Sequence, residues 1–317
     1  MRVLITGAGG FVGRHLSAQI GRAQPGASLT GTTLFPSESV HEAVADQRLV
    51  DLKCFEQTRS LLASCRPSAI YHLAAQAFVP RSFEDPWETL ENNIRAQLNI
   101  IRACLELEIR PRILVVSSAE IYGAVESSQL PLNEETAIRP TNPYSVSKVA
   151  QDMLALQYYL SHDLPIMRAR PFNHIGPGQN DRFVAPAFAR QIAAIEDGQQ
   201  DAVIYVGNLA AKRDFTDVRD IVRAYQLIVD RGQPGEAYNI ASGVARSIGR
   251  LLNTLLGLTE IEIEIREDPA RLRPVDVPEI RGDAGKLRRD TGWKPELTFE
   301  ETLRDVLEDC RARQSAS

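Results

Sequence analysis

Short apolar runs alternate with longer amphipathic stretches through the first half of the chain. A run such as Ile113-Leu114-Val115-Val116 has no polar residue in alternation, which is typical of a strand covered on both faces. Strands that alternate with helices form right-handed βαβ units, so we predict a doubly wound parallel sheet and an α/β fold. The predicted strands are Arg2–Thr6, Ser28–Thr33, Ala69–Leu73, Ile113–Ser117 and Ile166–Arg170, and the predicted helices are Phe11–Arg22, Phe55–Cys65, Pro86–Glu108 and Pro143–Ser161.

Three glycines at a spacing of three follow the first predicted strand. Gly7 permits a tight turn, Gly10 lets backbone amides approach a phosphate, and Gly13 lets the following helix pack closely. A strand, a glycine turn and a helix N-terminus seat the pyrophosphate of a dinucleotide, so the sheet is predicted to be of the Rossmann type. The alternative is a loop that needs only positive φ.

The pattern changes after Arg170. Loops rich in Pro, Gly and Asn, short helices and an alternating segment at Ile261–Ile265 replace the regular alternation, while Tyr238–Ile240 reads as a strand that returns to the main sheet. We therefore predict a smaller, interleaved C-terminal substrate-binding lobe. The predicted dinucleotide-binding domain is 1–171 with 213–241 returning to it, and the predicted lobe is 172–212 and 242–317.

Composition excludes several function classes. The 317 residues are 44% hydrophobic, enough for one large core or two modest ones, and a net charge of −5 disfavours binding to nucleic acid or anionic membranes. No apolar run has the length of a membrane span, and a predicted core strand follows Met1 directly, so we expect no signal peptide and a cytoplasmic protein. The four cysteines and five histidines have no metal-ligand spacing, so we expect reduced thiols and no metal.

The candidate chemistry lies on the predicted helix that Pro143 opens. Tyr144 and Lys148 are one turn apart on one face, where the ammonium would stabilise the phenolate and lower the tyrosine pKa. Such a pair suits a hydroxyl–carbonyl interconversion, although an ordinary exposed Tyr/Lys pair is the alternative. Ser118, at the end of an earlier strand, should open on the same crevice and bond a substrate oxygen.

The glycine loop, the strand-end Ser118 and Tyr144-x-x-x-Lys148 resemble the short-chain dehydrogenase/reductases, and the chain length resembles the extended branch of that family, which acts mostly on nucleotide sugars. In that branch the lysine also holds the nicotinamide ribose. The resemblance implies cofactor contacts from Gly7, Gly10, Phe11, Val12, Gly13, Thr32, Asp51, Leu52, Leu73, Ala74, Ala75, Asn93, Tyr144, Lys148 and Pro171.

The choice between NAD and NADP depends on the end of the second strand. An acid there would bind the ribose 2′-hydroxyl and favour NAD, but no acid occurs until Glu38. No arginine clamps a 2′-phosphate at that strand end either, although Arg14 could serve. The sequence slightly favours NADP(H) over NAD(H).

A second group of strings resembles the enzymes of this family that act on GDP-sugars, both 4-ketoreductases and 4,6-dehydratases. The strings are Arg168–Gln179, Lys212–Val218, Arg271–Val277 and Thr291–Pro295. The resemblance implies a homodimer with a four-helix interface, formed by the helices at 86–108 and 143–161. It also implies substrate contacts from Ser117, Ser118, Asn173, Val184, Asn208, Arg213, Arg273 and Asp276.

Ala119 separates the possible reactions. A 4,6-dehydratase needs a base and an acid besides the tyrosine; Glu120 occupies the base position, but Ala119 offers only a methyl group where an acid or hydroxyl is needed. We therefore expect NAD(P)H-dependent reduction of the C4 ketone of a GDP-4-keto-6-deoxy-mannose-type sugar to a GDP-6-deoxy-hexose of the GDP-rhamnose type. The alternatives are a dehydratase or epimerase that uses Glu120, and a non-catalytic dinucleotide-binding protein.

Overall fold

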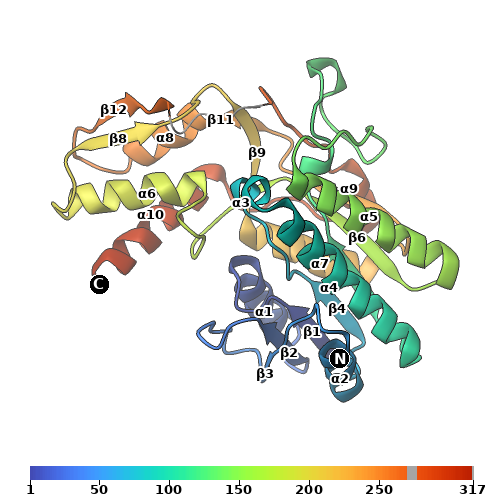
Figure 1. Ribbon diagram of the computed structural model, residues 1–317. Helices are drawn as coiled ribbons and strands as arrows, with labels where there is room; N and C mark the ends of the chain where they lie inside the picture. Colours follow the sequence, from blue (N-terminus) through green and yellow to red (C-terminus); the bar gives the residue numbers. More distant parts are fainter. Residues whose placement is uncertain (270–276, 316–317) are drawn as a thin grey trace.

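A parallel sheet forms the centre of the molecule (Figure 1). A computed structural model describes residues 1–269 and 277–315, and within them the sheet has seven strands in the order β10-β6-β5-β4-β1-β2-β3. This confirms the predicted doubly wound α/β fold. The strands are β1 (Arg2–Thr6), β2 (Ser28–Thr33), β3 (Asp46–Leu49), β4 (Ala69–His72), β5 (Arg112–Val116), β6 (Ile166–Pro171) and β10 (Ala237–Ile240).

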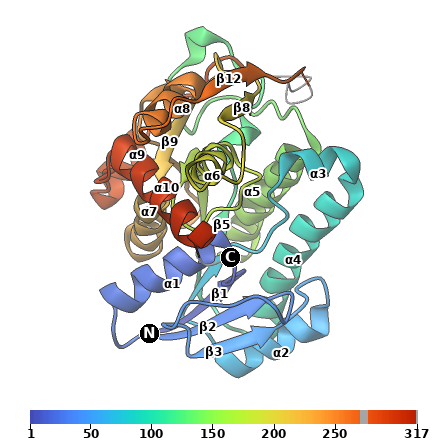
Figure 2. The ribbon, with the colours of Figure 1, turned by 90° about the vertical axis from the view of Figure 1, so that its left-hand side faces the viewer.

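Helices cover both faces of this sheet, and Figure 2 shows α1 and α4 on opposite sides of it. Helices α1 and α7 pack against each other on one face, and α2, α4 and α5 pack on the other. The helices are α1 (Phe11–Ala23), α2 (Phe55–Cys65), α3 (Val79–Glu84), α4 (Pro86–Glu106), α5 (Pro143–His162) and α7 (Val218–Arg231), with 3-10 turns at Ala119–Ile121 and Ser127–Gln129.

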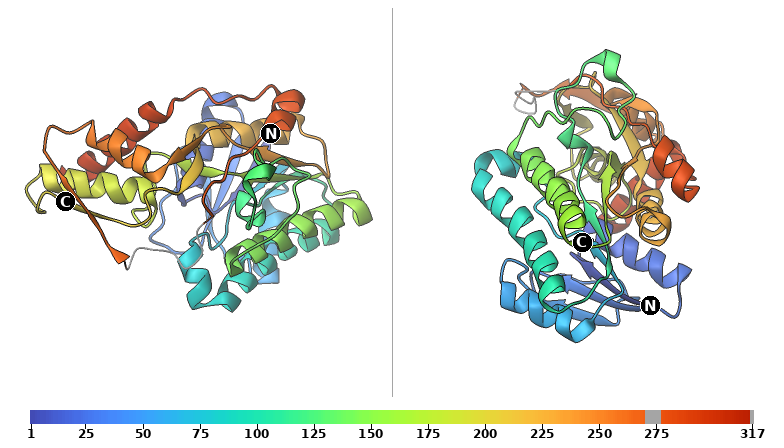
Figure 3. Two further views of the ribbon diagram at one scale, coloured as in Figure 1. Left: turned by 90° about the horizontal axis from the view of Figure 1, so that it is seen from above. Right: turned by 90° about the vertical axis from the view of Figure 1, so that its right-hand side faces the viewer.

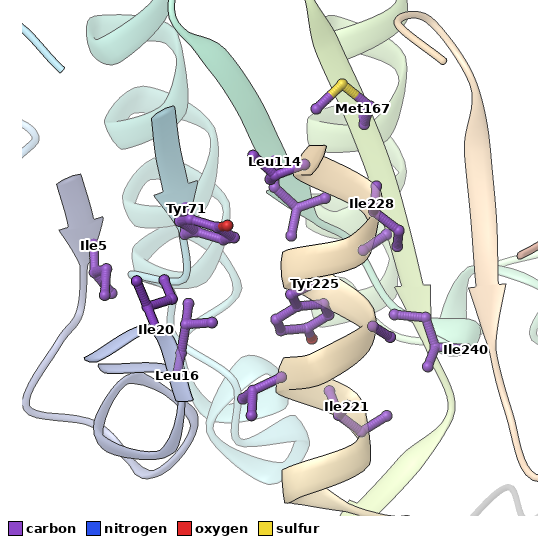
Figure 4. Close-up of a cluster of buried hydrophobic side chains, with 14 of the residues drawn as sticks. Ile5, Leu16, Ile20, Tyr71, Leu114, Met167, Ile221, Tyr225, Ile228 and Ile240 are labelled. Atoms are coloured by element: carbon purple, nitrogen blue, oxygen red, sulfur yellow. The ribbon is translucent and has the colours of Figure 1, made fainter. Parts of the chain in front are cut away.

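The strands bury side chains on both faces because each face has a helical layer. Ile5 and Tyr71 point into the core beneath α1 and α7, whereas Leu4 and Ile70 belong to the core beneath α2, α4 and α5. Figure 4 shows the first core, where Tyr225 of α7 lies among strand side chains. The continuous apolar runs in the sequence follow from this double coverage.

The smaller lobe has its own sheets and its own core. One sheet has the order β11-β9-β7, and β12 pairs with β8 beside it. Its elements gather together, away from α2 and β3 (Figures 1 and 3). They are β7 (Asn173–Ile175), α6 (Val184–Glu196), β8 (Val203–Val206), β9 (Lys212–Asp217), β11 (Ala245–Ser247), α8 (Ile248–Leu256), β12 (Glu264–Glu267) and α10 (Phe299–Ser315).

Two elements differ from the sequence prediction. The strand expected at Ile261–Ile265 is displaced toward the C-terminus, because β12 spans Glu264–Glu267 and all four of its residues are exposed. The edge strand β3 was not predicted: it is mostly exposed and polar, so it lacks the apolar signal of a buried strand. Both strands are held by backbone pairing to a neighbour rather than by burial.

Part of the segment assigned to the lobe belongs to the main core instead. Helix α9 (Gly285–Thr291) packs on α7 and β10, and its Leu287 is fully buried in the core beneath α7. Trp293 is also fully buried there, and its indole Nε1 donates to the carbonyl of Asp220 at 2.9 Å. The predicted lobe segment 242–317 therefore crosses back to the main sheet before it reaches α10.

In the described part of the chain, no helix combines the length and the apolar character needed to span a membrane.

A buried ion cluster docks α5 on the sheet. Asp152 of α5 has no exposed surface and accepts hydrogen bonds from Arg168 (2.7 Å) and, in a bidentate pair, from Arg170 (2.9 and 3.0 Å) of β6. Arg170 also donates to the Tyr122 hydroxyl at 3.1 Å. Burial opposes ionisation of Asp152, but the hydrogen bonds and charges of Arg170 and Arg168 outweigh it and hold the pKa of the carboxyl below its ordinary value.

We expect Asp152→Ala to lower the free energy of unfolding by about 3–5 kcal/mol, because two buried guanidinium groups lose their counter-ion. Urea denaturation followed by circular dichroism measures the change. The matched control is Asp46→Ala, which removes an exposed carboxylate that lies 2.7 Å from Arg48 and should leave the midpoint almost unchanged. Equal midpoints for the two variants would contradict the role given to Asp152.

Candidate active site

The glycine turn lies between β1 and α1 and is shaped by two glycines. Gly7 has φ +68°, and a Cβ there would lie 3.1 Å from the backbone of Ala74. A Cβ on Gly13 would lie 2.2 Å from the Gly7 carbonyl oxygen, so no side chain fits between the turn and α1. A glycine is therefore required at position 13 because α1 packs closely on the glycine turn. The sequence predicted instead that this glycine allows α1 to pack on the strand.

The N-terminus of α1 is open to an anion. Gly10 precedes the helix, no side chain caps it, and no acid lies in its first turn. The first amides of a helix have no partner within the helix, and the helix dipole adds positive potential there. These features fit the pyrophosphate of a dinucleotide.

Thr6 ties the ends of β1 and β4 together. Its hydroxyl oxygen accepts the amides of Leu73 and Ala74, both at 3.1 Å, and lies 2.9 Å from Nδ1 of His72. Because both acceptor positions of Thr6 are used, its proton is donated to Nδ1, and the proton of His72 is on Nε2. Burial, with a further effect of the Lys148 charge, lowers the pKa of His72 to about 3, so this ring is neutral and serves the fold.

The residues predicted to contact a cofactor mostly surround one edge of the sheet, the carboxyl ends of its strands, where ligands bind in such folds. They are Gly7 and Gly10 in the turn, Phe11, Val12 and Gly13 in the first turn of α1, Thr32 near the end of β2, Asp51 and Leu52 after β3, Leu73–Ala75 after β4, and Pro171 at the end of β6.

The end of β2 has no free carboxylate. Glu38 folds back over the loop, where its Oε2 accepts the amides of Leu34 (2.8 Å) and Phe35 (3.2 Å). Asp51 lines a surface cavity of about 690 Å³ with Leu34, while its own carboxylate accepts the amide of Lys53 at 2.9 Å. The capping role of Glu38 was not predicted from the sequence.

Asn93 acts as an internal anchor. Its Oδ1 accepts the amide of Gln76 at 2.8 Å, and its Nδ2 donates to the carbonyl of Gln76 (3.1 Å) and to the Ser147 hydroxyl (2.9 Å). Both amide protons are therefore used by the protein. Asn93 thereby holds α4, α5 and the loop after β4 in place, and its expected cofactor contact stays a prediction.

Tyr144, Lys148 and Ser118 lie together at the carboxyl end of β5. Tyr144 and Lys148 are both buried, with 8% and 4% of their surface exposed. The Lys148 ammonium donates to the Val116 carbonyl at 2.9 Å and lies 5.8 Å from the centre of the Tyr144 ring. Asn142 caps α5 by accepting the amide of Ser145 at 2.7 Å, and this fixes the first turn that carries Tyr144.

Burial dominates the electrostatics of the pair. It raises the pKa of Tyr144, with the Ser118 hydroxyl opposing the shift and the Glu120 carboxylate adding to it. It lowers the pKa of Lys148 to about 7. The expected lowering of the Tyr144 pKa is therefore absent in this state, and the phenol keeps its proton.

The residues that follow β5 have different surroundings. Ser117 is buried and donates to the carbonyl of Lys148 at 3.2 Å, so it supports α5, and its expected substrate contact stays a prediction. Ala119 is 6% exposed and packs among Ile121 and other apolar side chains. Glu120 accepts the Asn142 amide at 3.4 Å and stays beside the pair.

Four of the predicted substrate residues lie in the described part of the lobe. Asn173 begins β7 and is exposed, Val184 begins α6, and Arg213 of β9 donates to the carbonyls of Lys212 and Val277, both at 2.8 Å. Asn208 lies between β8 and β9, with its Oδ1 accepting the amide of Ala210 at 3.0 Å. Two further predicted contacts, Arg273 and Asp276, lie outside the described residues.

Among the described residues, no three or more His, Cys, Asp or Glu side chains lie together so that they could hold a metal ion.

Comparison with known proteins shows the family to which the chain belongs. The sequence model of the family described as GDP-mannose 4,6 dehydratase matches residues 4–306. The chain belongs to this family. The predicted resemblance to the extended short-chain dehydrogenase/reductases that act on GDP-sugars is thereby confirmed.

Individual members of the family are similar over nearly the whole chain. A GDP-6-deoxy-D-mannose reductase of Pseudomonas aeruginosa is 38% identical over 312 residues, 98% of each protein. A GDP-6-deoxy-D-talose 4-dehydrogenase of Aggregatibacter actinomycetemcomitans is 28% identical over 310 residues, 98% of this chain and 96% of its own. The solved structure of RMD from P. aeruginosa complexed with NADPH superposes with a TM-score of 0.88 at 36% identity, covering 98% of this chain and 99% of that one.

Proposed function

We propose that this protein uses NAD(P)H to reduce the C4 ketone of a GDP-4-keto-6-deoxy-mannose-type sugar, giving a GDP-6-deoxy-hexose of the GDP-rhamnose type. The observation that carries the proposal is the group formed by buried Tyr144 and Lys148 with the partly buried Ser118. This site can protonate a ketone oxygen, but the next residue in the chain, Ala119, offers no acid to expel water. The similarity to the P. aeruginosa reductase over 98% of the chain supports it.

The nicotinamide dinucleotide fits the glycine turn and the open end of α1, and when bound it supplies the hydride. The similar structure carries NADPH. Oε2 of Glu38 is occupied by the amides of Leu34 and Phe35, so this oxygen does not accept a ribose 2′-hydroxyl, the contact that favours NAD. This supports NADP(H) as the preferred form.

Each group around the ketone has a role that follows from its state. Tyr144 keeps its proton, so it donates that proton to the C4 oxygen as the general acid. Ser118 orients the same oxygen by a hydrogen bond. The Lys148 ammonium stabilises the phenolate that forms and holds the nicotinamide ribose. The GDP part is contacted by the predicted substrate residues Asn173, Val184, Asn208, Arg213, Arg273 and Asp276.

The four cysteines are free thiols, which supports a cytoplasmic location.

Tyr144→Phe should lower kcat by about 10²-fold or more with little change in the KM for the sugar nucleotide, because general acid catalysis contributes roughly 10²–10⁴-fold. Steady-state oxidation of NADPH measures both constants. Tyr158→Phe, which removes a hydroxyl farther along α5, is the control and should keep the wild-type kcat. A wild-type kcat for Tyr144→Phe would exclude this tyrosine as the acid.

The wild-type enzyme should consume GDP-4-keto-6-deoxy-mannose with one NADPH oxidised per sugar, and it should give almost no 4-keto product from GDP-mannose and oxidised cofactor. The methyl of Ala119 can neither donate a proton to the C6 hydroxyl nor hold a water molecule. Chromatography of the nucleotide sugars, with absorbance at the NADPH band, reads both reactions. Efficient conversion of GDP-mannose without net cofactor change would identify a dehydratase that uses Glu120.

We also propose that the protein is a homodimer in which α4 and α5 of two copies form a four-helix interface. The two helices lie side by side (Figure 3). Val146, Met153 and Leu160 repeat every seven residues along α5, so they share one face, and all three are exposed, Leu160 at 72%. An exposed apolar stripe of this kind is typical of an interface.

Met153→Glu with Leu160→Glu should convert the dimer to a monomer in sedimentation velocity, because two charges would be buried in the interface of each copy. The control is Ile265→Glu, since Ile265 is 40% exposed on β12 of the lobe and lies on neither helix. A wild-type protein that sediments as a monomer would contradict the proposed dimer, and a dimer that survives the double substitution would place the interface elsewhere.

A further inference from the structure

A single hydrogen bond joins the helix of the glycine turn to the loop that leaves the main sheet for the lobe. His15 of α1 lies with its Nε2 2.8 Å from the carbonyl oxygen of Pro177, a residue 162 positions later in the chain. A carbonyl oxygen can only accept, so His15 donates from Nε2. The neutral ring with its proton on Nε2 suffices, and burial lowers the pKa of His15 toward that form.

Ring packing adds a second contact between α1 and the segment that leaves the main sheet. Phe11, in the first turn of α1, meets His15 edge-on with centroids 5.4 Å apart, and its other neighbour is the His174 ring, stacked at 6.2 Å. Gly176, in the same loop, packs on the start of α7: a Cβ there would lie 2.5 Å from Val218, although at an ordinary contact distance of 3.7 Å from the Phe11 ring.

The two joined segments have separate ligands in the proposed function, on which this inference rests. Phe11 lies at the helix N-terminus that faces the dinucleotide, whereas Asn173 and the loop to Gln179 face the GDP-sugar. The loop is held on its other side by α10, where Asp309 accepts the amide of Gly178 at 2.9 Å. Within the described residues, His15 makes the only direct hydrogen bond between α1 and this loop.

We propose that His15 is a positioning residue that couples the two sites. Dinucleotide bound at α1 orders the segment 173–179, which comprises β7 and the loop after it, through the His15–Pro177 bond and so tightens binding of the GDP moiety. By linkage the GDP moiety tightens the dinucleotide by the same factor. His15 touches neither ligand in this account, and its effect passes through the loop.

The test compares binding rather than turnover. Calorimetry measures the Kd of GDP for the free protein and for the protein saturated with NADPH, and the ratio of the two is the coupling factor. We expect a factor of about five or more for the wild type and a value below about two for His15→Leu, which keeps an apolar contact with Phe11 but has no donor. His15→Gln, whose amide can reach the carbonyl as a donor, should restore most of the coupling.

The matched control is Gln19→Leu, one turn farther along α1. Gln19 donates to Gln226 of α7 at 3.1 Å, so the substitution removes a comparable hydrogen bond that does not reach the loop, and the coupling factor should stay at the wild-type value. Loss of coupling in Gln19→Leu, or no loss in His15→Leu, would overturn the role of His15. If His15→Gln fails to restore coupling, the hydrogen bond is not the link and the proposal also fails.

A measurement on the unaltered protein gives an independent test. Amide hydrogen exchange of the segment 173–179 should slow about threefold or more when NADPH is added without GDP, because the loop is ordered through α1. Unchanged exchange in this segment, with NADPH bound, would overturn the coupling. A wild-type protein that binds neither NADPH nor GDP would instead overturn the proposed function, and this inference with it.

Discussion

The pairing of Asp152 with Arg168 and Arg170 is the constraint on which the site depends. Helix α5 carries Tyr144 and Lys148 on a face that is buried and polar, and such a face gains little from the hydrophobic effect when it meets the sheet. The bidentate bond to Arg170 and the bond to Arg168 satisfy the carboxylate and fix the helix along β6. With α5 fixed, the Ser117 hydroxyl can donate to the backbone carbonyl of Lys148, and Asn93 of α4 can donate to the Ser147 hydroxyl.

The same helix carries two buried charges with opposite environments. Asp152 faces two arginines, so it stays ionised in spite of burial. Lys148 donates to a backbone carbonyl, and burial lowers its pKa to about 7. The structural charge is thus fully compensated, while the charge beside Tyr144 is left responsive to a ligand. A phosphate-bearing dinucleotide would favour the protonated lysine, the form that stabilises a phenolate.

A second buried carboxylate, that of Asp214, connects distant segments of the chain to the lobe. Asp214 of β9 has no exposed surface and accepts the amides of Ser242 (2.8 Å), Gly243 (2.9 Å) and Gly282 (3.1 Å). Two of these amides come from the loop after β10 and one from the segment before α9, so one side chain joins two distant segments to β9 beside Arg213. The position of Arg213 in β9 therefore depends on its neighbour in the strand.

The sequence by itself determined the order of the strands and helices and most of the candidate chemistry. Gly7 and Gly13 could be recognised because the turn geometry excludes any Cβ, and Tyr144 and Lys148 because helical spacing brings i and i+4 together. Only the tertiary structure decided which polar side chains are bonded to other parts of the protein. Asn93 and Ser117 are used internally, Glu38 caps its own loop, and Trp293 returns to the main core. These outcomes depend on partners far away in the chain, and no local pattern of residues records which distant group a buried hydrogen-bonding side chain will meet.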